Sequence, residues 1–266
     1  MCTIIVRHRM DYWCSTIIAA NRDEFYGRKW TGPQVLSEDP HVVGGRDEQQ
    51  GGSWLGLTAD GVFLALTNQA SYGARDESLR SRGELVVEAL KQGSFDGLKR
   101  FLSETDATTY NEFNVMFGDG REVWVGYGRQ TAKKIELEAL PSGVHVLCND
   151  RLGASAFPKA DRVRSQVVPI PRGTWPKMKA RLVEILADGT LPPPEDLPPL
   201  PPGAPFDDDV ARHLQATCIK TPIYGTVSST IAAVKKGKVV QYAFASGPPG
   251  ETEFEDFLPL THPPAG

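Results

Sequence analysis

The sequence contains few cysteines and no concentration of charge. Its four cysteines, at positions 2, 14, 148 and 218, are sparse for 266 residues and lack the close pairs of a zinc site or a redox motif. We therefore expect reduced thiols, with no disulfide framework, metal site or cofactor. The formal net charge is only −4, and the lysines and arginines are scattered, which argues against nucleic acid or an anionic membrane surface as a partner.

Long apolar runs are also absent. No stretch approaches the roughly 18 apolar residues of a membrane span. Residues 12–20 are mostly apolar, but the run is short, adjoins Asp11 and is followed by Asn-Arg-Asp-Glu where a signal peptide would have its cleavage site. The expected location is therefore cytoplasmic. The length and the 40% hydrophobic content suit one large domain over residues 1–266, or two small ones, and we favour one.

A cysteine directly after the initiator methionine is the most informative feature that is present. Initiator methionine is normally removed when the next side chain is small, so the mature chain is expected to begin at Cys2. A thiol of pKa ~8.5 would then share a residue with an α-amine of pKa ~7.7 to 8.0, which can accept the thiol proton near neutral pH. Cys2 would supply both nucleophile and base. The alternative is that Cys2 is a small apolar residue that starts a strand.

Further short motifs accompany Cys2 in a fixed order along the chain. They are Asn21-Arg22-Asp23-Glu24, Gly44-Gly45-Arg46-Asp47, Gly51-Gly52-Ser53-Trp54-Leu55-Gly56, Leu66-Thr67-Asn68, Arg82-Gly83-Glu84-Leu85-Val86, Asn114, Leu147-Cys148-Asn149 and Tyr224-Gly225-Thr226. In this order the chain resembles, over essentially its whole length, the NRDE family, also called the transport and Golgi organisation 2 family. That family in turn is similar to the cysteine-type N-terminal nucleophile hydrolases, which include bile-salt hydrolases and penicillin V acylases.

The periodicity of the chain predicts strands at both ends with helices between further strands. Residues 2–7 and 12–20 are expected to form a hairpin that brings Arg22 and Asp23 back towards Cys2. Residues 29–52 are rich in Gly and Pro, which predicts a loop, either at a pocket rim or on the surface. Other predicted strands are 54–58, 62–68, 113–117, 122–127, 134–140, 144–147, 223–234 and 239–245. Predicted helices are 81–92, 95–102, 156–168, 176–186 and 208–216.

The fold class expected from this pattern is α+β. The pattern alone fits several layouts, and the family resemblance implies a four-layer αββα sandwich. Residues 191–205 contain a polyproline stretch that cannot join a helix or a sheet, so we predict a stiff external connection there.

Acyl transfer by Cys2 needs groups that hold the amine, orient the substrate and stabilise an oxyanion. Asp23 can accept from the Cys2 amine, Arg22 can lower the thiol pKa, and the amides of Asn68 and Asn149 suit an oxyanion hole. The resemblance supports Asp23 and Asn149 best. Structurally, the same residues could instead form an ion pair or cap turns at strand ends.

Two more arginines are candidates, and one expected arginine is missing. Arg46 and Arg82 could bind a carboxylate or phosphate of a substrate, although surface ion pairs are the commoner role of such residues. The resembled family usually has Gly-Thr-Arg before its last strands, whereas this chain has Gly225-Thr226-Val227. Either another arginine replaces that side chain in space, or substrate preference or hydrolysis is altered.

Two classes of function remain open. The first is an amidohydrolase or acyl-transfer enzyme that acts on a non-peptide C–N bond of a small acyl or amide compound, with Cys2 as nucleophile. The second is a non-catalytic carrier of haem or acyl-lipid metabolites, which the resemblance also implies. Axial haem ligands would have to come from His8, His41, His145, His213 or Cys2, and none of these lies in a recognisable attachment motif.

Overall fold

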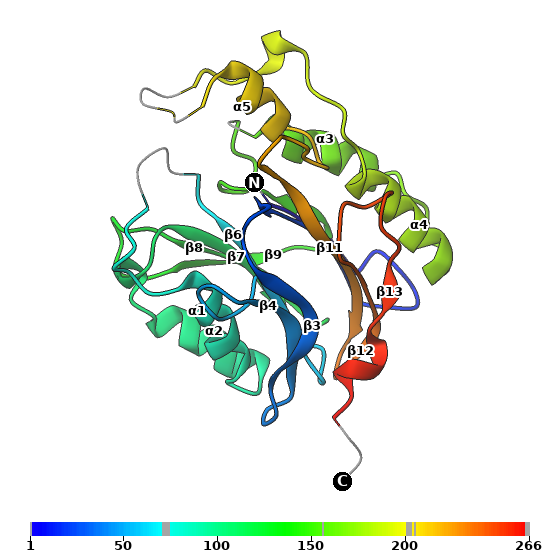
Figure 1. The fold of residues 1–266 in the computed structure, drawn as a ribbon. Coiled ribbons are helices and arrows are strands. Elements are labelled where there is room, and N and C mark those ends of the chain that lie inside the picture. Colours follow the sequence, from blue (N-terminus) through cyan, green and yellow to red (C-terminus); the bar gives the residue numbers. More distant parts are fainter. Residues whose placement is uncertain (1, 71–74, 156, 201–203, 205, 264–266) are drawn as a thin grey trace.

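The computed structural model describes residues 2–70, 75–155, 157–200, 204 and 206–263. Its strands form two antiparallel sheets (Figure 1). The six-stranded sheet has the order β10 (Gly143–Leu147), β1 (Thr3–His8), β2 (Thr16–Phe25), β11 (Tyr224–Lys235), β12 (Lys238–Ala245) and β13 (Glu255–Asp256). The seven-stranded sheet has the order β3 (Trp30–Ser37), β4 (Val42–Asp47), β5 (Leu55–Thr58), β6 (Phe63–Asn68), β7 (Phe113–Gly118), β8 (Val123–Gly128) and β9 (Glu136–Leu140).

One face of the six-stranded sheet is covered by two helices. Successive side chains of a strand point to opposite faces, so Ile5 and Ile17 lie on the same face as other odd-numbered residues of β1 and β2. There they pack against α3 (Pro158–Val167) and α4 (Trp175–Leu186) through side chains such as Val163 and Leu182. The apolar stripe of each helix is thus buried on the sheet.

Two other helices cover the outer face of the seven-stranded sheet. The helices α1 (Arg82–Leu90) and α2 (Phe95–Glu104) pack their apolar sides onto β5 to β7, with Leu85 and Leu98 fully buried. Ser94 caps α2, since its hydroxyl accepts a hydrogen bond from the backbone N–H of Gly97.

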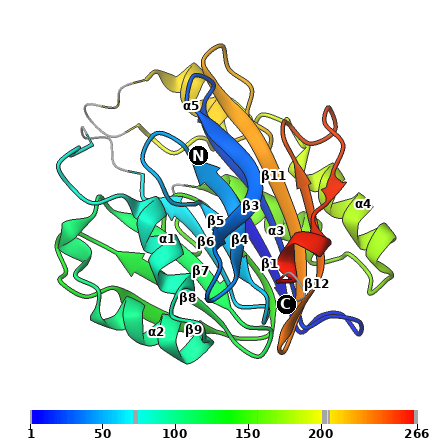
Figure 2. The same ribbon diagram turned by 60° about the horizontal axis from the view of Figure 1, so that its bottom comes forward.

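The inner faces of the two sheets form a third apolar core. Ile4, Ile18 and Ala20 of the first sheet face Leu57 and Met116 of the second across it. Figures 1 and 2 show the resulting order of layers, with α1 and α2 outside one sheet and α3 and α4 outside the other. This order is a four-layer αββα sandwich, and it confirms the predicted fold class.

Residues 29–52 differ from the prediction, because most of them form strands β3 and β4 instead of a loop. The Gly32-Pro33 pair falls where the β3–β4 register shifts, and β3 is an edge strand, the position where a sheet tolerates proline. Gly45 serves close packing: a Cβ atom there would lie 2.3 Å from the indole ring of Trp54. Glycine and proline usually indicate turns, but here Gly32, Pro33 and Gly45 lie inside strands of a sheet.

Smaller differences concern β2 and the C-terminal third. Strand β2 extends to Phe25, so the Asn-Arg-Asp-Glu motif lies inside the strand and not beyond it. In the Pro-rich segment a short 3₁₀ turn, η2 (Pro194–Asp196), precedes residues 201–203 and 205, which lie outside the described residues. Helix α5 (Asp208–Leu214) is tied back to this segment, because Arg212 donates to the Pro192 carbonyl at 2.7 Å.

Over the described ranges, no helix has the length and apolar character that crossing a membrane requires.

Candidate active site around Cys2

Cys2 lies at the end of the six-stranded sheet, directly before β1. The register pairs Thr3 with Asn21, which places Cys2 beside the Arg22-Asp23 part of β2. Its thiol donates to the backbone carbonyl of Asp23 with a sulfur–oxygen distance of 3.8 Å. Burial raises the pKa of the Cys2 thiol above its ordinary value, and the charge of Arg22 acts in the opposite direction. Cys2 and the Arg22-Asp23 part of the Asn-Arg-Asp-Glu motif therefore lie side by side, as expected from the predicted hairpin.

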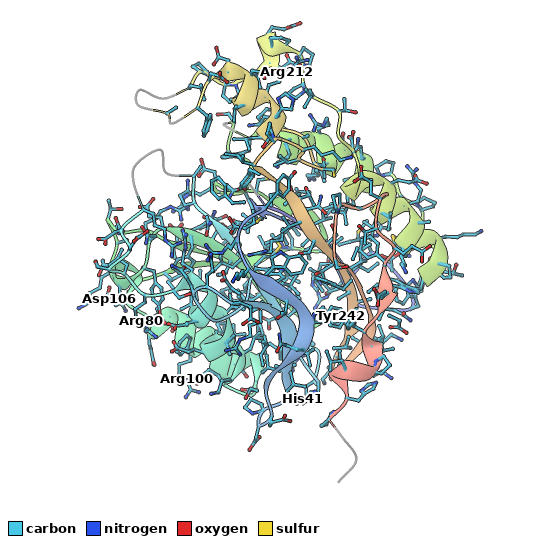
Figure 3. The ribbon with its side chains drawn as sticks, in the orientation of Figure 1. His41, Arg80, Arg100, Asp106, Arg212 and Tyr242 are labelled. Atoms are coloured by element: carbon cyan, nitrogen blue, oxygen red, sulfur yellow. The ribbon has the colours of Figure 1, made fainter. Side chains whose placement is uncertain are left out.

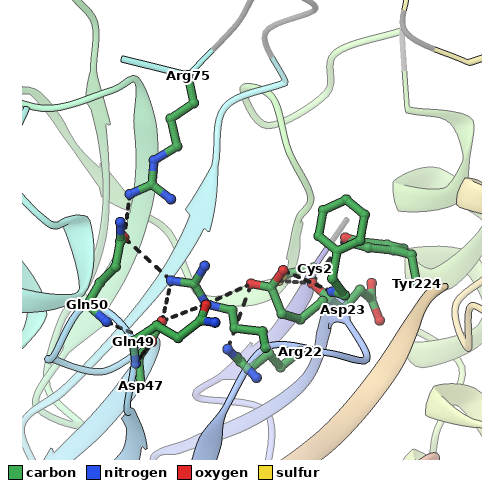
Figure 4. Close-up of polar contacts among 11 residues, drawn as sticks. Cys2, Arg22, Asp23, Asp47, Gln49, Gln50, Arg75 and Tyr224 are labelled. Carbon is green, nitrogen blue, oxygen red and sulfur yellow. Dashed lines mark hydrogen bonds and ion pairs between the residues drawn. The ribbon is translucent and has the colours of Figure 1, made fainter. Parts of the chain in front are cut away.

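Asp23 is held on both its backbone and its side chain. The hydroxyl of Thr226 donates to Asp23 Oδ1 at 2.6 Å, and the phenol of Tyr224 donates to the Asp23 carbonyl at 3.0 Å. Both partners belong to β11, which pairs with β2. The carbonyl that faces the Cys2 thiol is therefore fixed in position before any ligand binds (Figure 4).

Arg22 is buried, with 5% of its surface exposed, and its charge is only partly balanced. Its guanidinium carbon lies 4.2 Å from the ring centroid of Trp54 and 5.7 Å from that of Trp30. The nearest carboxylate oxygen is that of Glu24 at 3.8 Å, and Nη1 has no hydrogen-bond partner within the described part of the chain. Burial lowers the Arg22 pKa, which the neighbouring Glu24 partly offsets.

Asn149 and Asn68 join the two sheets at this end. Asn149 follows β10 and donates from Nδ2 to the backbone carbonyl of Asn68, the last residue of β6, at 2.7 Å. The Oδ1 atom of Asn149 is buried and accepts no hydrogen bond from any described residue. The hydroxyl of Thr67 donates to the Cys148 carbonyl at 2.6 Å and strengthens the same junction. Among the described residues, no hydrogen bond uses the second N–H of the Asn149 side-chain amide or the exposed side-chain amide of Asn68.

All five predicted catalytic residues line one cavity of about 450 Å³. They are Cys2, Arg22, Asp23, Asn68 and Asn149. Arg82 lines it as well, whereas Arg46 does not: Arg46 is about half exposed on β4 and lies 4.0 Å from Glu48. Sequence reasoning missed several other lining residues, namely Glu24, Arg28, Asp47, Gln50, Arg75, Phe206, Leu214 and Tyr224.

Val227 occupies a bulge in β11. The register of β11 against β2 shifts between Thr226 and Ser228, and Val227 is the additional residue, 8% exposed. It supplies no guanidinium to the cavity. The arginines that do line the cavity come from other parts of the chain, Arg22 and Arg28 near β2 and Arg75 and Arg82 near α1.

Among the described residues that line the cavity, Cys2 is the one candidate axial ligand of haem, and no histidine lies there. Over the described residues, no cluster of three or more His, Cys, Asp or Glu side chains is arranged to hold a metal ion. His8 bonds to Thr16, His41 to the Leu260 carbonyl, and His145 to the Pro141 carbonyl. Figure 3 labels His41 near the bottom of the view, well below the N-terminus that Figure 1 marks in the same orientation.

Comparison with known proteins gives one family and one group of folds. A family model described as "Transport and Golgi organisation 2" matches residues 1–244. The transport and Golgi organization protein 2 homologues of Homo sapiens and Bos taurus are 30% and 29% identical over 240 and 237 residues. In each case the match covers 82% of this chain and 81% of the relative.

The similar solved structures include hydrolases with low sequence identity to this chain. A mutant of the conjugated bile acid hydrolase from Clostridium perfringens has a TM-score of 0.54 and 12% identity, over 98% of this chain and 94% of that chain. The N-acylethanolamine-hydrolyzing acid amidase orthologue of Caenorhabditis elegans has a TM-score of 0.53 and 13% identity, over 87% and 92%. At such identities the likeness establishes a shared fold.

Proposed function

The chain belongs to the transport and Golgi organisation 2 family, and from the Cys2 site we propose that it is an amidohydrolase or acyl-transfer enzyme. Its substrate is a small molecule with a non-peptide amide bond. Cys2 is the nucleophile and the α-amine of Cys2, exposed by removal of Met1, is the base. A cytoplasmic setting suits this chemistry, since the thiol must stay reduced.

One observation carries the proposal: the thiol, two side-chain amides, an acid and a buried guanidinium all border one cavity. The structures with the same fold include enzymes whose names describe cleavage of conjugated or N-acylated compounds. A satisfied structural junction would use its polar atoms internally. Here Arg22 Nη1 and Asn149 Oδ1 have no hydrogen-bond partner within the described part of the chain, which fits a site that completes itself with a ligand.

In the proposed first step, the α-amine takes the thiol proton as the sulfur attacks the amide carbonyl carbon. The free N–H groups of Asn149 and Asn68 donate to the oxygen of the tetrahedral intermediate. The protonated α-amine then gives its proton to the leaving nitrogen as the C–N bond breaks. The products are an amine and a Cys2 thioester.

In the second step, water attacks the thioester carbonyl and gives a proton to the α-amine. The C–S bond then breaks, the protonated amine returns that proton to the departing sulfur, and a carboxylic acid is released. An amine in place of water gives acyl transfer with the same bond changes. Asp23 holds the α-amine, and Thr226 and Tyr224 hold Asp23. Arg22 favours the thiolate through its fixed charge.

A carrier of acyl-lipid metabolites is the second candidate. Aromatic and aliphatic side chains, among them Phe25, Phe206 and Leu214, line part of the cavity and favour binding of an acyl chain. A carrier of haem has less support, because Cys2 is the one expected axial ligand among the described residues that line the cavity, and none of the four histidines joins it there.

Intact-mass measurement separates enzyme from carrier. The processed protein is incubated with a panel of N-acyl amides, and we expect a mass increase equal to the acyl group on Cys2. Cys2→Ser is expected to lose at least ~10²-fold of any turnover, because a hydroxyl is a far weaker acid than a thiol. Cys14→Ser is the matched control, since Cys14 is buried away from the cavity.

Three results contradict the enzyme assignment. They are retention of Met1 in the mature protein, an adduct that survives in Cys2→Ser, and binding of acyl compounds without any adduct or turnover. The last result would favour the acyl-lipid carrier.

A further inference from the structure

The cavity has one apolar side. Phe25 and Tyr224 line it as an edge-to-face pair with ring centroids 5.2 Å apart, and Phe25 is 56% exposed. Phe206 and Leu214, which belong to a small apolar cluster around α5, continue this side. Exposed aromatic surface beside a cavity is costly in water, which favours an apolar ligand group here.

The other side of the cavity is rich in guanidinium groups. Arg28 is balanced, since Nη2 lies 2.6 Å from Asp47 Oδ2 and Nε lies 3.5 Å from Glu24. Arg75 donates to the neutral Gln50 side chain, and Arg82 donates to the backbone carbonyl of Glu112. Within the described residues, neither Arg75 nor Arg82 forms an ion pair with a carboxylate.

The structure holds these two arginines in place. Arg82 begins α1 and is only partly exposed, and its Nη1–O distance to Glu112 is 3.0 Å. The segment that carries Arg75 is fixed by a double hydrogen bond between Asp76 and Asn111: the Asp76 N–H donates to Asn111 Oδ1, and Asn111 Nδ2 donates to the Asp76 carbonyl. Asn111 itself lines the cavity.

Burying a charge that no opposite charge balances is unfavourable, and the pKa of Arg82 reflects this cost. Burial, together with the positive charges of Arg75 and Arg28, lowers the pKa of the Arg82 guanidinium to about 10. The group remains charged at neutral pH. A ligand anion would restore the balance that the protein does not provide.

We propose that the cavity binds an amphiphilic amide, with an anionic group on Arg75 and Arg82 and an apolar chain against Phe25, Phe206, Leu214 and Tyr224. Figure 4 shows Arg75 and Gln50 on one side and Tyr224 beside Cys2 and Asp23 on the other. This inference names the substrate class of the proposed enzyme and rests on that function for turnover, but not for binding.

A binding experiment with three probes tests the inference. The probes are N-dodecanoylglycine, N-dodecanoyl-O-phosphoethanolamine and the neutral N-dodecanoylglycine methyl ester, titrated calorimetrically into Cys2→Ala protein, which cannot form a thioester. We expect at least one anionic probe to bind about tenfold or more tightly than the neutral ester. The two anionic probes distinguish a carboxylate from a phosphate ligand.

Variants then locate the anionic group. Arg75→Gln and Arg82→Gln are each expected to remove most of the preference for the anion, while affinity for the neutral ester changes little. Arg100→Gln is the matched control for loss of one positive charge, because Arg100 is exposed on α2, where Figure 3 labels it, and does not line the cavity. Since Arg82 is partly buried, thermal unfolding checks its fold, and the exposed Arg75 provides an independent second variant.

Equal binding of the neutral and anionic probes overturns the inference, as does a preference that survives in the Arg75→Gln, Arg82→Gln double variant. Binding with the expected preference but without turnover by the Cys2 protein leaves the inference intact and contradicts the proposed enzyme. Turnover of neutral and anionic amides at equal efficiency contradicts the inference and leaves the proposed enzyme intact.

Discussion

The two faces of β2 use neighbouring residues of one motif in different ways. Asn21, on the face towards α4, uses its whole amide: Nδ2 donates to the carbonyls of Leu186 and Thr217, at 2.9 and 2.8 Å, and Ser229 donates to Oδ1 at 2.7 Å. Arg22, on the face towards the cavity, keeps Nη1 without a partner among the described residues and stacks on Trp54. The first side chain holds the layers together, and the second lines the cavity. A motif match alone does not separate these roles.

Asn21→Ala tests the structural role of the β2 face towards α4, and among the substitutions discussed here it is expected to have the largest effect. The substitution removes three hydrogen bonds and leaves the buried Leu186 and Thr217 carbonyls and the Ser229 hydroxyl without this partner. The free energy of unfolding should fall by about 3–5 kcal/mol. Urea unfolding measures it.

The matched control for Asn21→Ala is Gln92→Ala, because Gln92 is exposed and its amide makes one hydrogen bond, to the Glu88 carbonyl. It should cost well under about 1 kcal/mol. A loss below about 1 kcal/mol for Asn21→Ala would show that the buried amide does not hold α4 to the sheet.

The hairpin at the start of the chain was predictable because its pattern is local. Ile4, Ile5, Ile17 and Ile18 favour paired strands, and antiparallel pairing alone brings the end of β2 back to Cys2. Asn149 and Asn68 were predictable as residues at strand ends. Their direct hydrogen bond was not, because it joins two different sheets.

The arginines show why the rest could not be predicted. Gly44-Gly45 favoured a loop, so no alternation could be assigned to the residues after it. In β4, successive side chains point to opposite sides, which brings Asp47 to the cavity and turns Arg46 away. Arg75 carries no periodic or motif signal, since its place depends on the tertiary contact of Asp76 with Asn111.

A second test concerns the face of β2 towards the cavity and asks whether the α-amine of Cys2 activates its thiol. The expected effect on the labelling rate is intermediate in size. In a chain that retains Met1, the Cys2 nitrogen is a peptide nitrogen, and burial keeps the thiol protonated near neutral pH. Removal of Met1 places an ammonium group on the same residue, which lowers the thiol pKa. Iodoacetamide should therefore label the processed form about tenfold faster at pH 7.5, which corresponds to about one pKa unit.

The comparison form has a leucine inserted between Met1 and Cys2, which prevents removal of the methionine. The pH at which its labelling rate is half-maximal should be higher than for the processed form. The two rates should converge at high pH, where both thiols are ionised. Cys2→Ser gives the background from the three buried cysteines, Cys14, Cys148 and Cys218. Equal midpoints for the two forms would mean that the α-amine does not activate the thiol.

Arg22→Lys sharpens the comparison with the smallest expected effect, because it keeps the charge and removes the planar group that stacks on Trp54. Loss of this stacking costs about 1 kcal/mol or less, so the processed Cys2 should be labelled a few-fold more slowly at pH 7.5, with urea unfolding nearly unchanged. Arg22→Gln, which also removes the charge, should be slower again and should shift the labelling midpoint to higher pH. If Arg22→Lys and Arg22→Gln label alike, the guanidinium acts on Cys2 through packing alone and its charge does not favour the thiolate.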